Sequence, residues 1–265
     1  MGIFTEIAAL RPLVAYLLLF CFFMGLTLTA SFAIQRFTEF QMRQRHNEIA
    51  GFFFGVIGVV YGVLLAFITV AVWEKYNTAT ENVNRETTAA RLMYRNLNLC
   101  EDQGTAEKIE QQLQAYVHAV VEKEFPAMAK MKKSPATDKA MDDLWANMKK
   151  LKPKRSYEQS QYDEILNNLN KICHFRNERL ETAINSKLVG VMRFIVILGA
   201  LITLFFAVVF AAENFWWHIT MTALLALLLC TILFILLELG HPFLSGTPVH
   251  PDGYIELLEI MKSAD

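Results

Sequence analysis

Apolar residues are gathered into four blocks that are each long enough to cross a membrane. A helix needs about 20 consecutive, mostly apolar residues to span the hydrocarbon core of a bilayer. Four segments meet this length: Leu13–Ile34, Ile49–Trp73, Leu188–Ala212 and Phe215–Leu239. The pattern predicts an all-α polytopic membrane protein, in which two pairs of transmembrane helices flank a long polar segment.

The first block has a second interpretation as a signal peptide, because Ser31, Phe32 and Ala33 resemble a small-x-small cleavage site. Its apolar run exceeds the roughly 7–15 residues of a signal core, and Glu6 interrupts the basic start that a signal peptide needs. We therefore expect this block to be retained as a transmembrane span.

The polar segment between the second and third blocks has the pattern of a helical domain. Apolar residues recur at helical spacing in "TAEKIEQQLQAYVHAVVEKEF" and in "SYEQSQYDEILNNLNKICHFRNERLETAI". Pro126, Pro135 and Pro153 are expected to end helices. The expected domains are a first membrane pair (1–73), a cytoplasmic helical domain (74–187), a second membrane pair (188–239) and a cytoplasmic C-terminal tail (240–265).

Basic residues near the span ends predict the orientation, because cytoplasmic flanks carry an excess of Lys and Arg. The side that holds both termini and the middle domain has Arg11, Lys75, Arg85, Arg91, Lys171, Arg176, Arg179, Lys187 and Lys262. The opposite side has Arg36, Arg43 and Arg45. We therefore expect both termini in the cytoplasm.

A stripe of glycines distinguishes the second block. Gly51, Gly55, Gly58 and Gly62 fall within about 60° of one another on a helix that advances 100° per residue. Lipid tails give two helices no hydrophobic reason to associate, whereas small residues let their backbones approach closely. The glycine stripe is therefore predicted to pack against another helix.

A second line of residues runs beside the glycine stripe at seven-residue intervals: Asn47, Phe54, Tyr61 and Ile68. Two interpretations of this line remain open. It packs inside one subunit, or it lines an axial pore in an oligomer. In the second case a ring of Phe54 side chains would form a hydrophobic constriction, which gates a pore by dewetting.

Composition and motifs narrow the function further. The net charge of −1 indicates no nucleic-acid partner, and the four cysteines show no disulfide or zinc spacing. No common catalytic motif occurs, so we predict no enzyme, no cofactor and no metal site. The spans hold no ionisable side chain except Arg193, His218 and Glu238 near their ends, which disfavours a proton-coupled carrier.

Over most of its length the chain resembles the bacterial bestrophin-like family. The resemblance begins at "NEIAGFFFGVIGVVYGVLLAFITVAVWEKYNTATENVNRETTAARLMYRNL" and includes Asn47, Gly51, Tyr61, Gly62, Phe67, Trp73, Tyr76, Ala79 and Glu86. It closes with "HPFLSGTPVHPDGY", similar to the family's Pro-Phe-x-x-Gly ending, here Pro242, Phe243 and Gly246. The sequence departs from the family where an aspartate usually precedes the Pro-Phe pair, since Gly240 and His241 stand there.

The resemblance implies a bestrophin-like ion channel of the bacterial inner (plasma) membrane. Its second span would line an axial pore in a homo-oligomer, suspected to be a pentamer, and its partners would be the lipid bilayer and inorganic ions. Calcium gating is not carried over, because no cluster of Asp and Glu suits a calcium site. Two alternatives stay open: a non-conducting scaffold or signalling protein that acts through its cytoplasmic helices, and a small-solute transporter.

Overall fold

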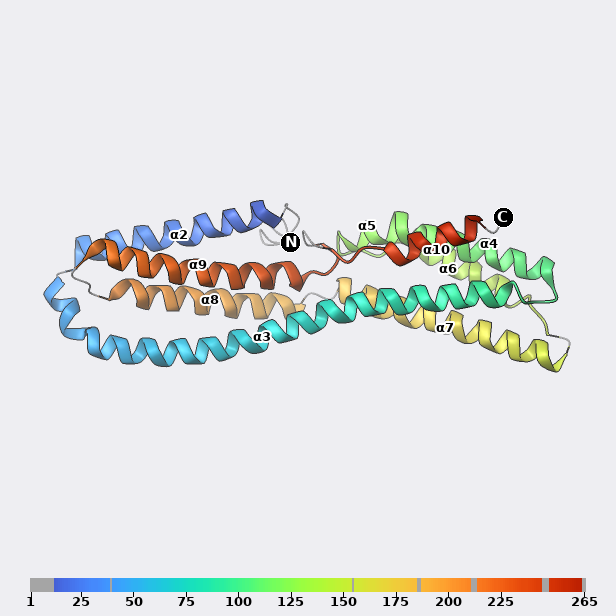
Figure 1. The fold of residues 1–265 in the computed structure, drawn as a ribbon, viewed down its shortest axis with the longest axis horizontal. Helices are drawn as coiled ribbons and strands as arrows, with labels where there is room; N and C mark the ends of the chain where they lie inside the picture. The colour runs from blue at the N-terminus through green and yellow to red at the C-terminus, as the bar shows by residue number, and fades with distance from the viewer. Residues whose placement is uncertain are drawn as a thin grey trace. The chain divides into compact units, whose positions relative to one another are not determined.

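The structure, a computed structural model, describes residues 12–38, 40–153, 155–184, 187–210, 214–244 and 248–263. Every regular element in these ranges is helical, which confirms the predicted all-α class. The elements (Figure 1) are α2 (Pro12–Phe37), α3 (Phe40–Leu97), α4 (Gln103–Ala119), the π-helix η1 (Val120–Glu124), α5 (Phe125–Met128), α6 (Pro135–Met148), α7 (Ser156–Ile184), α8 (Lys187–Val209), α9 (Phe215–Gly240) and α10 (Asp252–Ser263).

The described chain divides into two compact units. Unit 1 holds residues 12–75 and 187–241, and unit 2 holds residues 76–184, 242–244 and 248–263. The long helix α3 contributes to both units, since the division falls between Lys75 and Tyr76. The C-terminal segment, expected as a tail, is part of unit 2 as α10, which buries Tyr254, Leu257, Leu258 and Met261.

Unit 1 contains the four predicted spans. By length and apolar composition the helices that can cross a membrane are Leu13–Ile34, Gln44–Leu97, Gly190–Val209 and Phe215–Gly240. Within this unit α2, α8 and α9 all contact one another (Figure 1). The helices share a core of apolar side chains, including Phe23, Tyr61, Leu65, Val196, Leu204 and Leu233.

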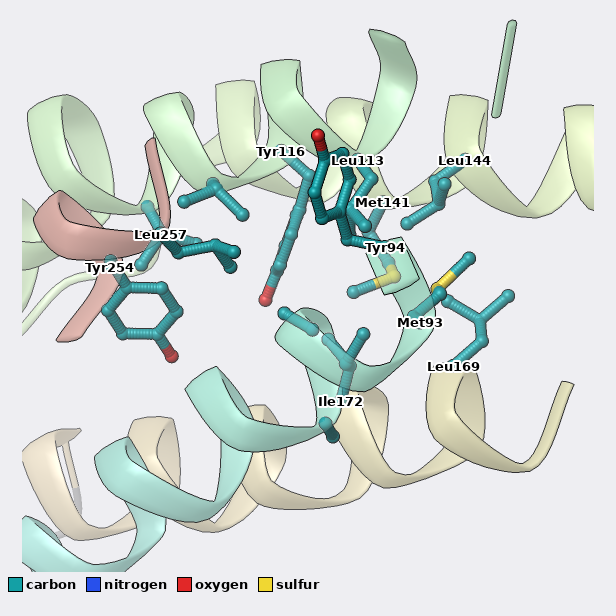
Figure 2. Packing of buried hydrophobic residues seen from close by; sticks show 14 of the residues in the cluster. Met93, Tyr94, Leu113, Tyr116, Met141, Leu144, Leu169, Ile172, Tyr254 and Leu257 are labelled. Carbon is teal, nitrogen blue, oxygen red and sulfur yellow. The ribbon is translucent and has the colours of Figure 1, made fainter. Parts of the chain in front are cut away.

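Unit 2 is a helical bundle with its own apolar core (Figure 2). The core includes Met93, Leu113, Tyr116, Leu144, Leu169 and Tyr254. Helix α6 begins with Ser134 as its N-cap and Pro135 in its first turn. Pro126 likewise lies in the first turn of α5, directly after η1. The expectation that Pro126 and Pro135 end helices is therefore wrong, because proline needs no N–H partner at that position and starts helices well.

Candidate functional site

The glycine stripe of α3 is open along most of its length within the described chain. A Cβ atom added at Gly55, Gly58 or Gly62 would meet nothing within 4 Å. At Gly51 it would meet only the Phe210 ring, at 3.7 Å. A single chain does not test whether this face packs against another helix, so that assignment stays a prediction.

The line beside the glycine stripe turns toward the subunit's own helices. Tyr61 is 7% exposed, and its hydroxyl donates a hydrogen bond to the Val196 carbonyl at 2.6 Å. Its ring occupies the space beside Gly199, where an added Cβ would overlap it. Of the two interpretations that the sequence left open, these contacts favour packing within the subunit for Tyr61.

Other members of the line are less enclosed. Phe54 is half-buried and meets Phe210 edge to face, with 5.6 Å between the ring centroids. Ile68 is half-buried against the unit 1 core, and Asn47 is half-buried. Pore lining by Asn47, Phe54 and Ile68 stays a prediction.

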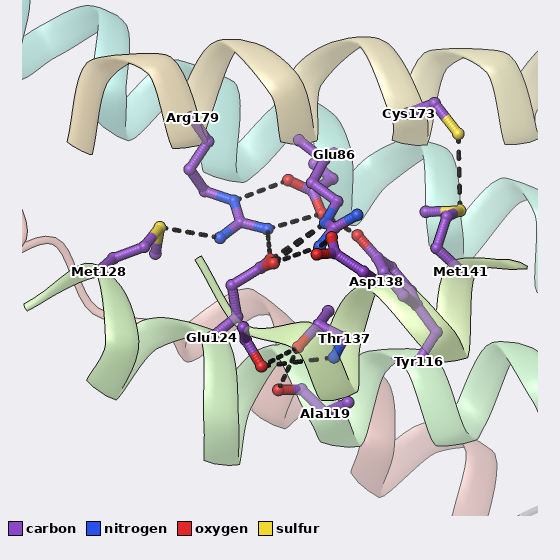
Figure 3. Close-up of polar contacts among 12 residues, drawn as sticks. Glu86, Tyr116, Ala119, Glu124, Met128, Thr137, Asp138, Met141, Cys173 and Arg179 are labelled. Atoms are coloured by element: carbon purple, nitrogen blue, oxygen red, sulfur yellow. Dashed lines mark hydrogen bonds and ion pairs between the residues drawn. The ribbon is translucent and has the colours of Figure 1, made fainter. Parts of the chain in front are cut away.

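Unit 2 contains a cluster of charges that the sequence reasoning missed. We define the buried charge cluster as Glu86 of α3, Glu124 of η1, and Arg176 and Arg179 of α7 (Figure 3). Arg179 reaches both carboxylates, with Nε 2.8 Å from Glu86 Oε2 and Nη2 2.7 Å from Glu124 Oε2. Arg176 also bonds Glu124, through Nε at 3.1 Å from Oε1.

The cluster is closed by polar and aromatic partners. Tyr116 donates to Glu86 Oε1 at 2.6 Å, and Asp138, which is half exposed, accepts from Arg176 at 2.7 Å. The Arg179 guanidinium also lies 5.4 Å from the centre of the Phe125 ring. Buried charges cost several kcal/mol each unless they are paired and hydrogen-bonded, and here the carboxylates and guanidiniums satisfy one another.

Burial and the carboxylates act on the ionisation of the cluster in opposite directions. Burial lowers the pKa of Arg179, but Glu86, Tyr254 and Glu124 raise it by more, so the guanidinium stays charged. The pKa of Tyr116 is raised well above its ordinary value by burial and then by the charge of Glu86. Tyr116 therefore keeps its proton and remains a hydrogen-bond donor.

A π-helix brings Glu124 into the cluster. The helix that begins as α4 widens over Val120–Glu124 before it continues as α5, and both end residues of this segment are buried. A π-turn accommodates one extra residue in a helix and often occurs at functional sites. The wider turn places Val120 and Glu124 on the inner face, whereas Glu122 of the same turn is 52% exposed in its side chain.

A sequence signal for the cluster exists in the spacing of α7. Ile165, Leu169 and Ile172 mark a buried stripe, and Arg176 and Arg179 continue it at steps of four and three residues. A charged residue on an apolar stripe indicates a buried, paired charge. The predicted orientation uses both arginines only as basic residues near a span end.

Tyr116→Phe tests the closure of the cluster. The substitution removes one hydroxyl, so Glu86 Oε1 loses the Tyr116 donor and keeps Nη2 of Arg179 at 3.1 Å. Loss of a hydrogen bond to a buried charge costs about 1.5–3 kcal/mol. We expect the unfolding free energy of unit 2 to fall by about this amount in chemical denaturation. Tyr157→Phe, at an exposed tyrosine, is the control, and an equal effect from both changes would contradict the assignment.

The C-terminal motif lies partly within unit 2. Phe243 is 5% exposed and packs edge to face on Phe125, with ring centroids 5.9 Å apart. Pro242 accepts a backbone hydrogen bond from Val249 at 2.7 Å. Gly246 lies outside the described residues. Across the described part of the chain, no group of three or more His, Cys, Asp and Glu side chains is placed to hold a metal ion.

The four spans, the glycine-bearing long helix and the helical bundle define an all-helical polytopic membrane protein. The family model of the Bestrophin-like domain matches residues 21–254, so the chain belongs to the bestrophin-like family. No protein with a curated description matches its sequence.

Solved structures share the fold at low sequence identity. Two are mutants of a bacterial bestrophin homologue from Klebsiella pneumoniae. One is 14% identical and has a TM-score of 0.66, with 93% of this chain and 98% of that chain covered. The other is 13% identical, also with a TM-score of 0.66, and the coverage is 91% and 97%. A crystal structure described as a membrane protein has a TM-score of 0.69 at 12% identity, covering 93% and 96%.

Proposed function

We propose that the chain is the subunit of a homo-oligomeric ion channel whose axial pore runs along α3. The observation that carries the proposal is the open glycine stripe, because Gly55, Gly58 and Gly62 meet nothing within 4 Å where a Cβ would stand. Glycine gains little from contact with lipid, and its value in a span is the close approach of a second helix. A neighbouring copy of α3 is the partner that a symmetric ring would supply.

We propose that the face of α3 opposite Tyr61 also lines the pore. Phe52, Val56 and Val63 lie about 140–180° from Tyr61 on a helix, and their exposed fractions are 70%, 47% and 52%. With the Tyr61 face held by α8, this opposite face is free to surround an axis. A ring of such side chains forms an apolar constriction for inorganic ions.

We further propose that the protein resides in the bacterial inner membrane with both termini cytoplasmic. The charge asymmetry of the span flanks supports this orientation. Unit 2, with its buried charge cluster, would then lie in the cytoplasm.

Ion flux through liposomes that contain the purified protein tests the proposal. Val56→Ser should increase flux, because a hydroxyl in an apolar constriction favours its wetting. Phe54→Ala tests the line predicted from the sequence: a higher flux would support Phe54 as a pore residue, and an unchanged flux would favour the face opposite Tyr61. Val191→Ser, at an exposed valine of α8 that is 59% accessible, is the control and should leave flux unchanged. No current from any of these proteins would contradict a channel.

A further inference from the structure

An apolar groove opens within unit 1 among the four spanning helices. Its volume is about 350 Å³, and its floor is formed by buried side chains that include Phe23, Val72, Val196 and Leu233. Leu18 and Phe22 stand at its rim with 51% and 62% of their surface exposed. The groove therefore opens toward the surface of the spans rather than being sealed inside them.

One end of the groove carries positive charge. Arg193 is the only charged side chain that lines the groove among the described residues. Its Nη2 lies 2.5 Å from Nε2 of His241, and Lys75 is near enough for the charge of Arg193 to lower the Lys75 pKa. Glu238, which is buried, precedes His241 by three residues near the end of α9.

His241 adds a hydrogen-bonding group rather than a third charge. Burial lowers its pKa to about 4, and the charges of Arg193 and Lys75 act in the same direction. At neutral pH the imidazole is therefore uncharged and can accept a hydrogen bond from the Arg193 guanidinium. The guanidinium is held in place at the mouth of the groove.

These charges lie where a lipid headgroup is found. Lys75 follows the second span by two residues, His241 follows the fourth directly, and Arg193 lies in the first turns of α8. Long basic side chains near span ends extend to the membrane surface. The groove is basic at this level and apolar where it continues into the spans. A phospholipid has the same arrangement, because its phosphate lies at the membrane surface and its acyl chains extend into the bilayer.

We infer that this groove binds an anionic phospholipid, with one acyl chain against Phe23, Val196 and Leu233 and the phosphate at Arg193 and Lys75. Charge complementarity selects an anionic headgroup over a zwitterionic one, because Arg and Lys both bind phosphate oxygens and a net negative headgroup offsets their charge. The inference is independent of whether α3 forms a pore.

Lipid retention measured by native mass spectrometry tests the inference. The purified protein is exchanged into nanodiscs that contain equal amounts of phosphatidylglycerol and phosphatidylcholine with identical acyl chains, and is then released for analysis. We expect phosphatidylglycerol to be retained about tenfold more than phosphatidylcholine, which corresponds to about 1.4 kcal/mol. Arg193→Gln should bring the ratio close to one, and Arg36→Gln, at an exposed arginine at the end of α2, should leave it unchanged.

Two variants on adjacent residues of α8 test the acyl-chain part of the site. Ile197 lines the groove, whereas Leu198 does not and is 45% exposed. Ile197→Trp should fill the groove and abolish retention of both lipids, and Leu198→Trp should not.

Three results would overturn the inference. The first is a phosphatidylglycerol preference that survives Arg193→Gln. The second is equal retention by the two tryptophan variants, which would indicate annular lipid only. The third is dissociation of an oligomer by Ile197→Trp alone, because it would show that a second copy of the chain fills the groove.

Discussion

Replacement of Gly58 by leucine is expected to dissociate the oligomer and abolish ion flux while the subunit stays folded. A Cβ added at this position meets nothing within 4 Å in its own chain, and Gly58 is exposed, so the subunit has room for a larger side chain here. Across a helix–helix contact that depends on close backbone approach, the added isobutyl group forces the two helices apart. We expect the concentration for half-dissociation in detergent to rise at least about tenfold, equal to about 1.4 kcal/mol.

The matched control is Gly25→Leu on α2. This glycine also has nothing within 4 Å of an added Cβ and lies on an exposed face of a span. Both substitutions gain a similar amount of helix propensity. Analytical ultracentrifugation of the two variants separates the outcomes. If Gly58→Leu stays oligomeric, or if Gly25→Leu dissociates equally, the glycine stripe is not the subunit contact and the pore proposal fails with it.

Replacement of Arg179 by methionine should be the most destabilising single change in unit 2. The guanidinium and both of its carboxylate partners are fully buried. The substitution removes the guanidinium, so Glu86 and Glu124 lose that cation. Breaking a buried ion pair on one side costs about 3–5 kcal/mol. This is a large part of the roughly 5–15 kcal/mol that a domain has in total. With Trp73, Trp216 and Trp217 of unit 1 replaced by phenylalanine, the fluorescence of Trp145 reports on the denaturation of unit 2.

Two further proteins separate charge from packing. Arg85→Met disrupts an exposed pair with Glu81, whose side chains are 56% and 57% accessible, and should cost no more than about 1 kcal/mol. Adding Glu86→Gln to Arg179→Met should recover part of the lost stability, because Glu86 loses its ion-pair partner whereas Glu124 keeps Arg176. If the double variant is less stable than Arg179→Met, the cost arises from packing and not from unpaired charge.

The spans were predictable because a bilayer imposes a simple requirement. A run of apolar residues that is long enough must become a helix, and this made all four spans visible from composition alone. The glycine stripe was equally visible, since its spacing places Gly51, Gly55, Gly58 and Gly62 together whatever the rest of the chain does. Periodicity could not decide which neighbouring line faces the subunit core. That required the contact of Tyr61 with Val196, 135 residues away.

The buried charge cluster was harder to predict because its members are brought together by tertiary structure. Glu86 and Arg179 are 93 residues apart, and Glu124 reaches the cluster only because η1 widens the helix that carries it. A regular 3.6-residue period gives no indication of a π-turn. The stripe of α7 did contain a signal for Arg176 and Arg179, but the sequence alone could not name the carboxylates that neutralise them.

The contact between Tyr61 and Gly199 restricts how this protein can evolve. No residue with a Cβ fits at position 199 while the Tyr61 ring stays in place. If Gly199 is kept and Tyr61 is replaced by a smaller residue, a void remains between the second and third spans. A change at either position alone is therefore expected to lower the stability of the packing between these spans. Among related sequences we expect a larger residue at 199 to occur together with a smaller one at 61, so that the two positions mutate as a correlated pair.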